Sequence, residues 1–196
     1  MKKNKNGTPI VFAALLTALA IACAVLVFCY ARTKLKRAAY PIAYVEEFTA
    51  AADRYGLDRT LVAAVICTES RFRADAVSGD GAVGLMQLLP STAEWICSIR
   101  GTEYSEEKLY EPAYNSDLGC WLLKWLMDRY SGSERNALIA YNAGVGRLDG
   151  WLQTGADENG ELTDIPYAET RNYVQRVSEL KIRYGEDYAE ELGIAG

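Results

Sequence analysis

The first candidate for acid–base chemistry is Glu69, which comes two residues after the end of the apolar segment 61–67. Apolar residues recur in this segment at helical spacing, so it predicts a helix whose C-terminal end carries the glutamate. Apolar neighbours remove water from a carboxyl group and favour its protonated form, which a general acid needs near neutral pH. Helix position alone also fits an ordinary exposed glutamate paired with Arg71 or Arg73.

Three other stretches carry polar groups that could accompany this acid. Residues 84–87 read Gly-Leu-Met-Gln, a glycine followed by one uncharged amide among apolar side chains. Residues 140–144 read Ala-Tyr-Asn-Ala-Gly, which places a phenol and an amide before a glycine that stops a helix. Glu169 and Tyr173, within 165–174, lie on one helical face at i,i+4. Taken singly, each stretch also has a purely structural explanation.

Histidine is absent from the sequence, which excludes Ser–His and Cys–His nucleophile pairs and the common zinc sites that contain histidine. Outside the N-terminal apolar run, Cys67, Cys97 and Cys120 have spacings that match neither a CxxC metal cluster nor an even disulfide framework. We interpret them as buried free thiols, and a single Cys97–Cys120 bridge is the alternative if the domain is extracytoplasmic. The sequence therefore predicts no metal site and no cofactor.

The N-terminal region contains a hydrophobic run long enough to cross a membrane. Residues 6–31 carry no charge, and residues 10–31 are apolar apart from Thr17. About 20 such residues span the ~30 Å hydrocarbon core as a helix. A cleaved signal peptide would have a shorter apolar part and a small-x-small cleavage site, which residues 28–30 do not supply, and Cys23 follows a poor lipidation box. We therefore expect an uncleaved, single-pass anchor.

The charge distribution leaves the orientation of this anchor open and argues against one class of partner. Three lysines precede the run and four basic residues follow it, so the positive-inside rule does not decide. From residue 38 onward, 14 Lys and Arg face 26 Asp and Glu, a net charge of −12. Such a domain repels nucleic acid and anionic lipid headgroups. We expect no nucleic-acid partner, and membrane contact only through the N-terminal helix.

The remainder of the chain predicts an all-α domain, because runs with strict β-type alternation are scarce. Asp58 is expected to cap the helix that leads to Glu69, and Ser91 to cap the following one. Residues 153–164 read as a polar loop, and Pro166 fits the first turn of a last helix that Gly185 closes. Helices are expected at residues 41–55, 59–69, 91–100, around 106, 113–130, 134–142 and 166–185.

Read together and in this order, the motifs resemble the lytic transglycosylases of the soluble (Slt-type) family, which are relatives of goose-type lysozyme. The resemblance covers about residues 41–185 and rests on Glu69-Ser70, Gly84-Leu85-Met86-Gln87, Ala140-Tyr141-Asn142-Ala143-Gly144 and Glu169-Thr170-x-x-Tyr173-Val174. It implies a lysozyme-like fold with a cleft for peptidoglycan glycan strands and Glu69 as the catalytic acid. It also implies substrate-binding roles for Ser78, Met86, Gln87, Tyr141, Asn142 and Tyr173.

The family's reaction explains why one well-placed acid suffices where glycoside hydrolases usually employ two carboxylates. The substrate's own N-acetyl oxygen attacks, and the same glutamate then accepts the proton of the muramyl C6 hydroxyl, so that a 1,6-anhydro ring forms without water. Asp75 and Asp80 follow Glu69 and could supply the second acid of a hydrolase. Aspartate is also common in turns for local backbone bonding, and Asp80 stands where some relatives carry serine. We interpret Glu169 as structural, and Trp121 and Trp125 as core residues.

The sequence thus predicts a short tail at 1–9, a transmembrane anchor at 10–31, a basic linker at 32–40, a lysozyme-like catalytic domain at 41–185 and a C-terminal tail at 186–196. The resemblance implies a murein lytic transglycosylase that cleaves the MurNAc-β-1,4-GlcNAc bond, and the apolar run makes it a membrane-anchored one. Substrate location places its catalytic domain on the extracytoplasmic side. A hydrolytic muramidase on the same fold and a non-catalytic wall-binding scaffold are the alternatives.

Overall fold

The computed structural model describes residues 7–194, and within them the chain forms eight α-helices and one 3-10 helix. Extended pairing in this part is limited to isolated bridges, of which Val77–Val83 and Val83–Leu88 flank one loop. The chain divides into an N-terminal unit that ends at Pro41 and a second unit that begins at Ile42. The predicted all-α class is confirmed.

The N-terminal unit is one helix, α1 (Gly7–Ala39). Its segment Val11–Arg32 has a mean hydropathy of 2.8 and is long and apolar enough to cross a membrane. At 1.5 Å per residue this segment is about 33 Å long, close to the thickness of a hydrocarbon core. The helix continues through most of the predicted basic linker, because Ala, Leu, Lys and Arg are good helix formers. The first six residues of the expected tail lie outside the described part.

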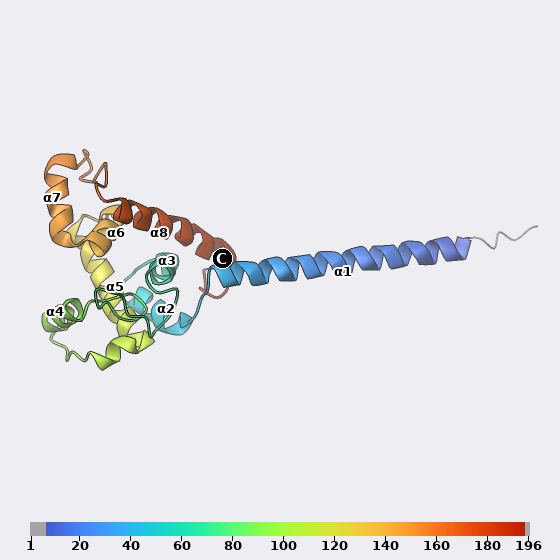
Figure 1. The fold of residues 1–196 in the computed structure, drawn as a ribbon, viewed down its shortest axis with the longest axis horizontal. Coiled ribbons are helices and arrows are strands. Elements are labelled where there is room, and N and C mark those ends of the chain that lie inside the picture. Colours follow the sequence, from blue (N-terminus) through green and yellow to red (C-terminus); the bar gives the residue numbers. More distant parts are fainter. Residues whose placement is uncertain (1–6, 195–196) are drawn as a thin grey trace, which may run out of the picture. The chain divides into compact units, whose positions relative to one another are not determined.

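Helices α2 (Val45–Arg54) and α3 (Arg59–Glu69) begin the second unit. The Asp58 side chain accepts a hydrogen bond of 2.8 Å from the backbone N–H of Thr60, so the predicted cap of α3 is confirmed. Residues 61–67 of α3 are fully buried. In Figure 1 this helix lies inside the domain, and it packs against both α2 and α8.

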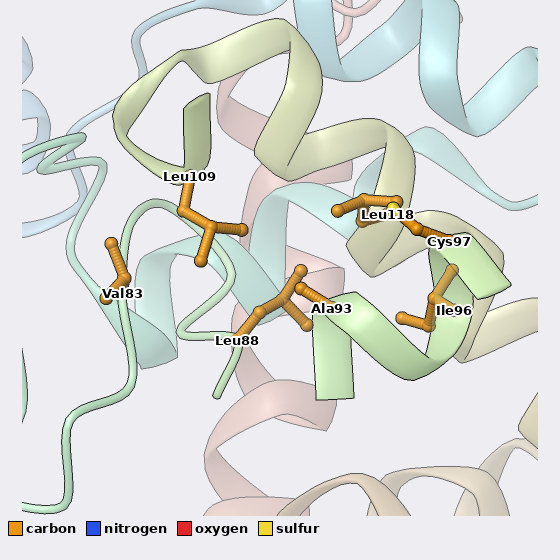
Figure 2. Close-up of a cluster of buried hydrophobic side chains, with 7 residues drawn as sticks. All are labelled: Val83, Leu88, Ala93, Ile96, Cys97, Leu109 and Leu118. Carbon is orange, nitrogen blue, oxygen red and sulfur yellow. The ribbon is translucent and has the colours of Figure 1, made fainter. Parts of the chain in front are cut away.

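Helices α4 (Pro90–Arg100), η1 (Glu107–Tyr110) and α5 (Pro112–Arg129) follow a loop. Proline occupies the first turn of α4, where its fixed φ suits a helix start, and Ser91 does not act as the predicted cap. Figure 2 shows the buried cluster that joins this loop to the three helices. Its members are Val83, Leu88, Ala93, Ile96, Cys97, Leu109 and Leu118.

The last three helices are α6 (Glu134–Ala143), α7 (Val145–Gly155) and α8 (Ala168–Asp187). Gly144 joins α6 to α7 with a φ of 90°, a conformation that favours glycine. Helix α7 was not expected from the sequence, and α8 passes through Gly185 instead of ending there. Tyr188 and Leu192 are buried, so the predicted C-terminal tail is wrong for the described residues up to 194.

The three cysteines of this unit are buried and unbridged, as the interpretation as free thiols predicted. The Cys97 thiol contacts the hydroxyl of Tyr114 at 3.4 Å. Burial raises the pKa of Cys120, so this thiol stays protonated and unreactive.

Candidate active site

Glu69 is the last residue of α3 and is half-buried. Burial raises the pKa of its carboxyl group to about 7, against the smaller lowering by the nearby hydroxyl of Tyr173. The C-terminal end of a helix carries partial negative charge, which acts in the same direction as burial. Arg73, one of the two arginines that could have paired with this carboxyl group, donates instead to the backbone oxygen of Ser70 at 3.2 Å. The carboxyl group is therefore built to hold a proton near neutral pH.

Two tyrosines accompany this carboxyl group. The hydroxyl of Tyr173, on α8, is buried and interacts with Glu69, although it makes no hydrogen bond of standard geometry within the described part of the chain. The hydroxyl of Tyr141, at the end of α6, donates to the backbone oxygen of Met86 at 2.8 Å. Burial first, and then the charge of Glu69, raises the pKa of both phenols well above its ordinary value. Both tyrosines therefore remain hydrogen-bond donors.

The loop at 83–88 is pinned to α5 by Asn115, which is fully buried. The Asn115 side-chain oxygen accepts a hydrogen bond of 2.8 Å from the backbone N–H of Met86, and its amide nitrogen donates to the oxygens of Val83 and Leu109, each at 2.9 Å. Gly84 has a φ of 80°, and a Cβ added there would lie 2.3 Å from the Asn115 amide nitrogen. Asn115 was not singled out from the sequence, although it positions a whole motif.

Gln87 has a φ of 49°, and its amide nitrogen donates to the backbone oxygens of Ala76 at 3.1 Å and Gly84 at 2.9 Å. Its amide N–H groups thus hold the loop, which leaves the amide oxygen for a ligand. Met86 is fully buried, and a Cβ added at Gly119 would lie 2.3 Å from its sulfur. The predicted contact of Met86 with a sugar is therefore wrong, because its side chain packs against Gly119 of α5 and is not exposed.

The remaining predicted residues lie on different parts of the surface. Ser78 is exposed, and its hydroxyl oxygen accepts a hydrogen bond of 3.0 Å from the backbone N–H of Ala82, as in a turn. Asn142 is half-buried, and its side-chain oxygen accepts a hydrogen bond of 2.8 Å from Thr170 on α8. Glu169 is exposed in the first turn of α8, where an acidic side chain suits the helix dipole. Contacts of Ser78 and Asn142 with substrate stay predictions.

A groove of about 710 Å³ lies between the loop around Asp80, helices α4 and α5, and the junction of α6 with α7. This volume is within the ~300–1,000 Å³ typical of small-ligand sites. Tyr141 and Asn142 line it, and Tyr141 is also close enough to Glu69 for the carboxylate charge to affect its pKa. The other lining residues are Leu89, Thr92, Trp95, Leu122, Trp125, Leu126, Ala140, Ala143, Gly144, Val145 and Arg147.

The tryptophans of this groove correct our interpretation of one residue. Trp125 is half-buried and lines the groove, so its assignment to the core is wrong. Its i,i+4 partner Trp121 packs beside it in a stacked arrangement with ring centroids 6.5 Å apart. Trp95 also lines the groove and was not singled out, because neither its neighbours nor its spacing distinguishes it from a surface aromatic.

A comparison with family models matches residues 46–163 to the transglycosylase SLT domain. The chain belongs to this family. The SLT chain is 36% identical over 141 residues to a putative soluble lytic murein transglycosylase of Haemophilus influenzae, a match that covers 70% of the chain and 24% of the relative. It is 30% identical over 168 residues to membrane-bound lytic murein transglycosylase C of Edwardsiella ictaluri, covering 72% of the chain and 46% of the relative. The chain thus spans a quarter to a half of these relatives' length.

Solved structures agree with the family assignment. An inactive Glu-to-Gln mutant of lytic transglycosylase Slt from Pseudomonas aeruginosa superposes with a TM-score of 0.69 at 34% identity, over 80% of the SLT chain and 25% of that protein. The 70 kDa soluble lytic transglycosylase of Escherichia coli gives a TM-score of 0.71 at 26% identity, over 82% and 27%. The predicted lysozyme-like SLT fold and the family resemblance are confirmed.

Proposed function

We propose that this SLT chain is a murein lytic transglycosylase that cleaves the MurNAc-β-1,4-GlcNAc bond of peptidoglycan. The observation that carries the proposal is the half-buried carboxyl group of Glu69, whose pKa burial raises to about 7. A general acid works best when its pKa lies near the operating pH. The groove that reaches Tyr141 and the family membership support a glycan as the substrate.

In the first step, the protonated Glu69 gives its proton to the glycosidic oxygen while the bond from that oxygen to the muramyl C1 breaks. The carbonyl oxygen of the muramyl N-acetyl group attacks C1 and forms an oxazolinium ion, and the GlcNAc portion leaves with a new hydroxyl. Such substrate assistance replaces the second carboxylate of ordinary glycosidases. It suits a site whose other polar groups near the acid are the phenols of Tyr141 and Tyr173.

In the second step, the Glu69 carboxylate accepts the proton of the muramyl C6 hydroxyl. The C6 oxygen attacks C1, the bond from C1 to the acetyl oxygen breaks, and the N-acetyl group is restored. The product is a 1,6-anhydromuramyl end, Glu69 is protonated again, and no water is consumed. The carboxylate must exist transiently, and the nearby hydroxyl of Tyr173 stabilises this form, since its interaction with Glu69 lowers the pKa of that carboxyl group.

In this proposal the predicted site residues have different tasks. Tyr173 orients and stabilises the acid, whereas Tyr141 and Asn142 line the sugar-binding groove. Gln87 offers its amide oxygen to a sugar, because its amide nitrogen is already bonded to the loop. Ser78 offers a hydroxyl from the exposed loop to the N-acetyl group.

We further propose that α1 anchors the enzyme in the cell membrane as a single span, with the catalytic domain on the extracytoplasmic side. The length and hydropathy of Val11–Arg32 support the span, and membrane-bound relatives support anchoring. The orientation follows from the location of the proposed substrate, peptidoglycan. Anchoring would restrict cleavage to wall close to the membrane.

Mass spectrometry of sacculi digested by the full-length protein tests the reaction. Anhydromuramyl ends are expected. Reducing muramyl ends would identify a hydrolytic muramidase, for which Asp80 is the candidate second carboxylate because it lines the groove, whereas Asp75 is not among the lining residues. No release of fragments would leave a non-catalytic wall-binding scaffold.

A further inference from the structure

Three tryptophans form one cluster, and two of them, Trp95 and Trp125, line the groove together with Tyr141 and Asn142. The Trp95 and Trp125 rings meet edge to face with centroids 5.2 Å apart, and Trp95 meets Trp121 in the same way at 5.8 Å. Trp95 belongs to α4, and the other two belong to α5. Two helices thus supply a single aromatic surface.

This surface is partly open to solvent. Trp95 is 38% exposed and Leu89 is 41% exposed, and both line the groove together with Trp125. Large apolar side chains that remain in water do not contribute the stabilising free energy that their burial would give. Exposed apolar surface in a concave place is typical of a binding site. The groove therefore holds exposed apolar surface that a ligand could cover.

The cluster is also held in place. Trp121 and Leu122 pack against the buried cluster of Figure 2, which contains Ile96 and Cys97 of α4. The guanidinium of Arg129 lies over the Trp125 ring, 5.6 Å from its centroid, and the same side chain binds Asp149 of α7 at 2.6 Å. A surface fixed in this way loses little conformational entropy when a ligand stacks on it.

We infer that Trp95 and Trp125 form a sugar-binding subsite for the glycan strand, separate from the residues around Glu69. This inference rests on the proposed function and deepens it. The C–H face of a pyranose ring is flat and apolar, and it fits an indole ring that is open on one side. Thr92 and Asn142 of the same groove supply polar groups for the sugar hydroxyl and acetamido groups.

The charges of the groove favour a neutral sugar over a charged peptide. Its lining contains one acidic residue, Asp80, and one basic residue, Arg147, so it has no net formal charge. The surrounding domain is strongly acidic, with a net charge of −12 from residue 38 onward, and would repel an acidic stem peptide. Tyr141 lines the same groove and is close enough to Glu69 for the carboxylate charge to affect its pKa, so one continuous strand can reach both the tryptophans and the acid.

Binding of peptide-free β-1,4-linked GlcNAc oligomers of two to six sugars tests the inference. The full-length protein in detergent carries Glu69→Gln, so that no turnover interferes, and calorimetry measures the dissociation constant. Affinity is expected to increase with oligomer length. Adding Trp95→Ala or Trp125→Ala is expected to weaken hexamer binding about tenfold and dimer binding much less, since one stacked ring contributes about 1.4 kcal/mol.

Trp151 provides the matched control, because it is also half-buried but does not line the groove. Trp151→Ala should leave the length dependence unchanged, and Trp125→Phe should retain most of it because an aromatic face remains. Folded Trp95→Ala and Trp125→Ala proteins that bind the hexamer normally would overturn the inference. It would also be overturned if Trp151→Ala weakened binding as strongly, or if free stem peptides displaced the hexamer.

A second measurement does not depend on whether the alanine variants fold. The chain contains four tryptophans, so 5-fluorotryptophan NMR of the Glu69→Gln protein can resolve each of them. The resonances of Trp95 and Trp125 should shift on titration with the hexamer, while that of Trp151 stays. Unchanged Trp95 and Trp125 resonances at saturating hexamer would refute the subsite.

The two hypotheses fail in different ways. If oligomer binding depends on length and on Trp95 and Trp125, but the unsubstituted protein does not cleave sacculi, the proposed enzyme function is refuted and the subsite is supported. If the protein produces anhydromuramyl ends normally, but neither alanine substitution affects hexamer binding, the subsite is refuted and the proposed enzyme function is supported.

Discussion

Tyr173, on the last helix, presents its buried hydroxyl to the carboxyl group of Glu69 at the end of α3. Residues far apart in the sequence thus meet because α8 packs along α3. The contact has two opposite effects on the acid. The body of the tyrosine helps to exclude water, which raises the pKa of Glu69, whereas its hydroxyl stabilises the carboxylate and lowers that pKa.

Replacing Glu69 by Gln should abolish most of the turnover of sacculi. The amide has nearly the same shape but cannot donate or accept the proton in either step, so the rate is expected to fall by at least the ~10²–10⁴-fold typical of a general acid. Release of soluble muropeptides measures this loss. Glu169→Gln, an exposed change on α8, serves as the matched control. Near-normal turnover by the Glu69 variant would exclude Glu69 as the acid.

The pH dependence of kcat/KM should report the protonation of Glu69. Because the acid must enter the first step protonated, kcat/KM is expected to fall as the pH increases through about 7. Tyr173→Phe removes the hydroxyl whose interaction with Glu69 lowers this pKa, so the alkaline limb should move to higher pH. Tyr55→Phe, whose hydroxyl bonds to Asp117 at 3.1 Å, is the control and should leave the limb in place. A shift to lower pH in Tyr173→Phe would contradict the assigned interaction.

Glu69 should also make the domain less stable as the pH increases. A folded pKa of about 7 against an ordinary value of 4.5 means that the folded state binds this proton more tightly, so stability is fully present below 4.5 and falls as the pH increases to about 7. Glu69→Gln removes this loss and should stabilise the protein at pH 8 by about 3 kcal/mol, with little effect at pH 4. Urea unfolding at the two pH values measures the difference; equal effects at both would show that burial does not perturb the group.

Asn115→Ala should destabilise the domain strongly. The substitution leaves the backbone N–H of Met86 and the oxygens of Val83 and Leu109 buried without their partner. Unsatisfied buried groups cost about 1–3 kcal/mol each, so we expect a loss of about 3 kcal/mol or more in the free energy of unfolding. Asn172→Ala, on the exposed face of α8, should cost under about 0.5 kcal/mol. Comparable losses in both variants would mean that the Asn115 hydrogen bonds do not hold the loop.

Local signals in the sequence were sufficient for the helices that carry the acid. The Asp58 side chain caps α3 by accepting a hydrogen bond from the backbone N–H of Thr60, only two residues away. The apolar stripe that ends at Glu69 has the period of a helix. Helix α7 was not predicted from the sequence, because its helical propensity is lowered by Gly146, Gly150 and Gly155. Its position depends on packing against α6, which no local pattern records.

The site residues were harder to predict wherever a side chain has two uses. Met86 and Gln87 belong to one motif, yet the first fills the core and the second bonds to its own loop. Trp125 has the i,i+4 spacing of a core residue, but its neighbours leave one part of it open to the groove. Burial of such residues depends on which elements cover them, and these elements are distant in the sequence.

The packing of α8 on α3 has a consequence for the newly made chain. Ribosomes release α3 long before α8, so the carboxyl group of Glu69 is at first hydrated and has ordinary acidity. Only docking of the final helix brings Tyr173 to it and removes the water. The carboxyl group of Glu69 thus acquires its raised pKa only after α8 has packed on α3.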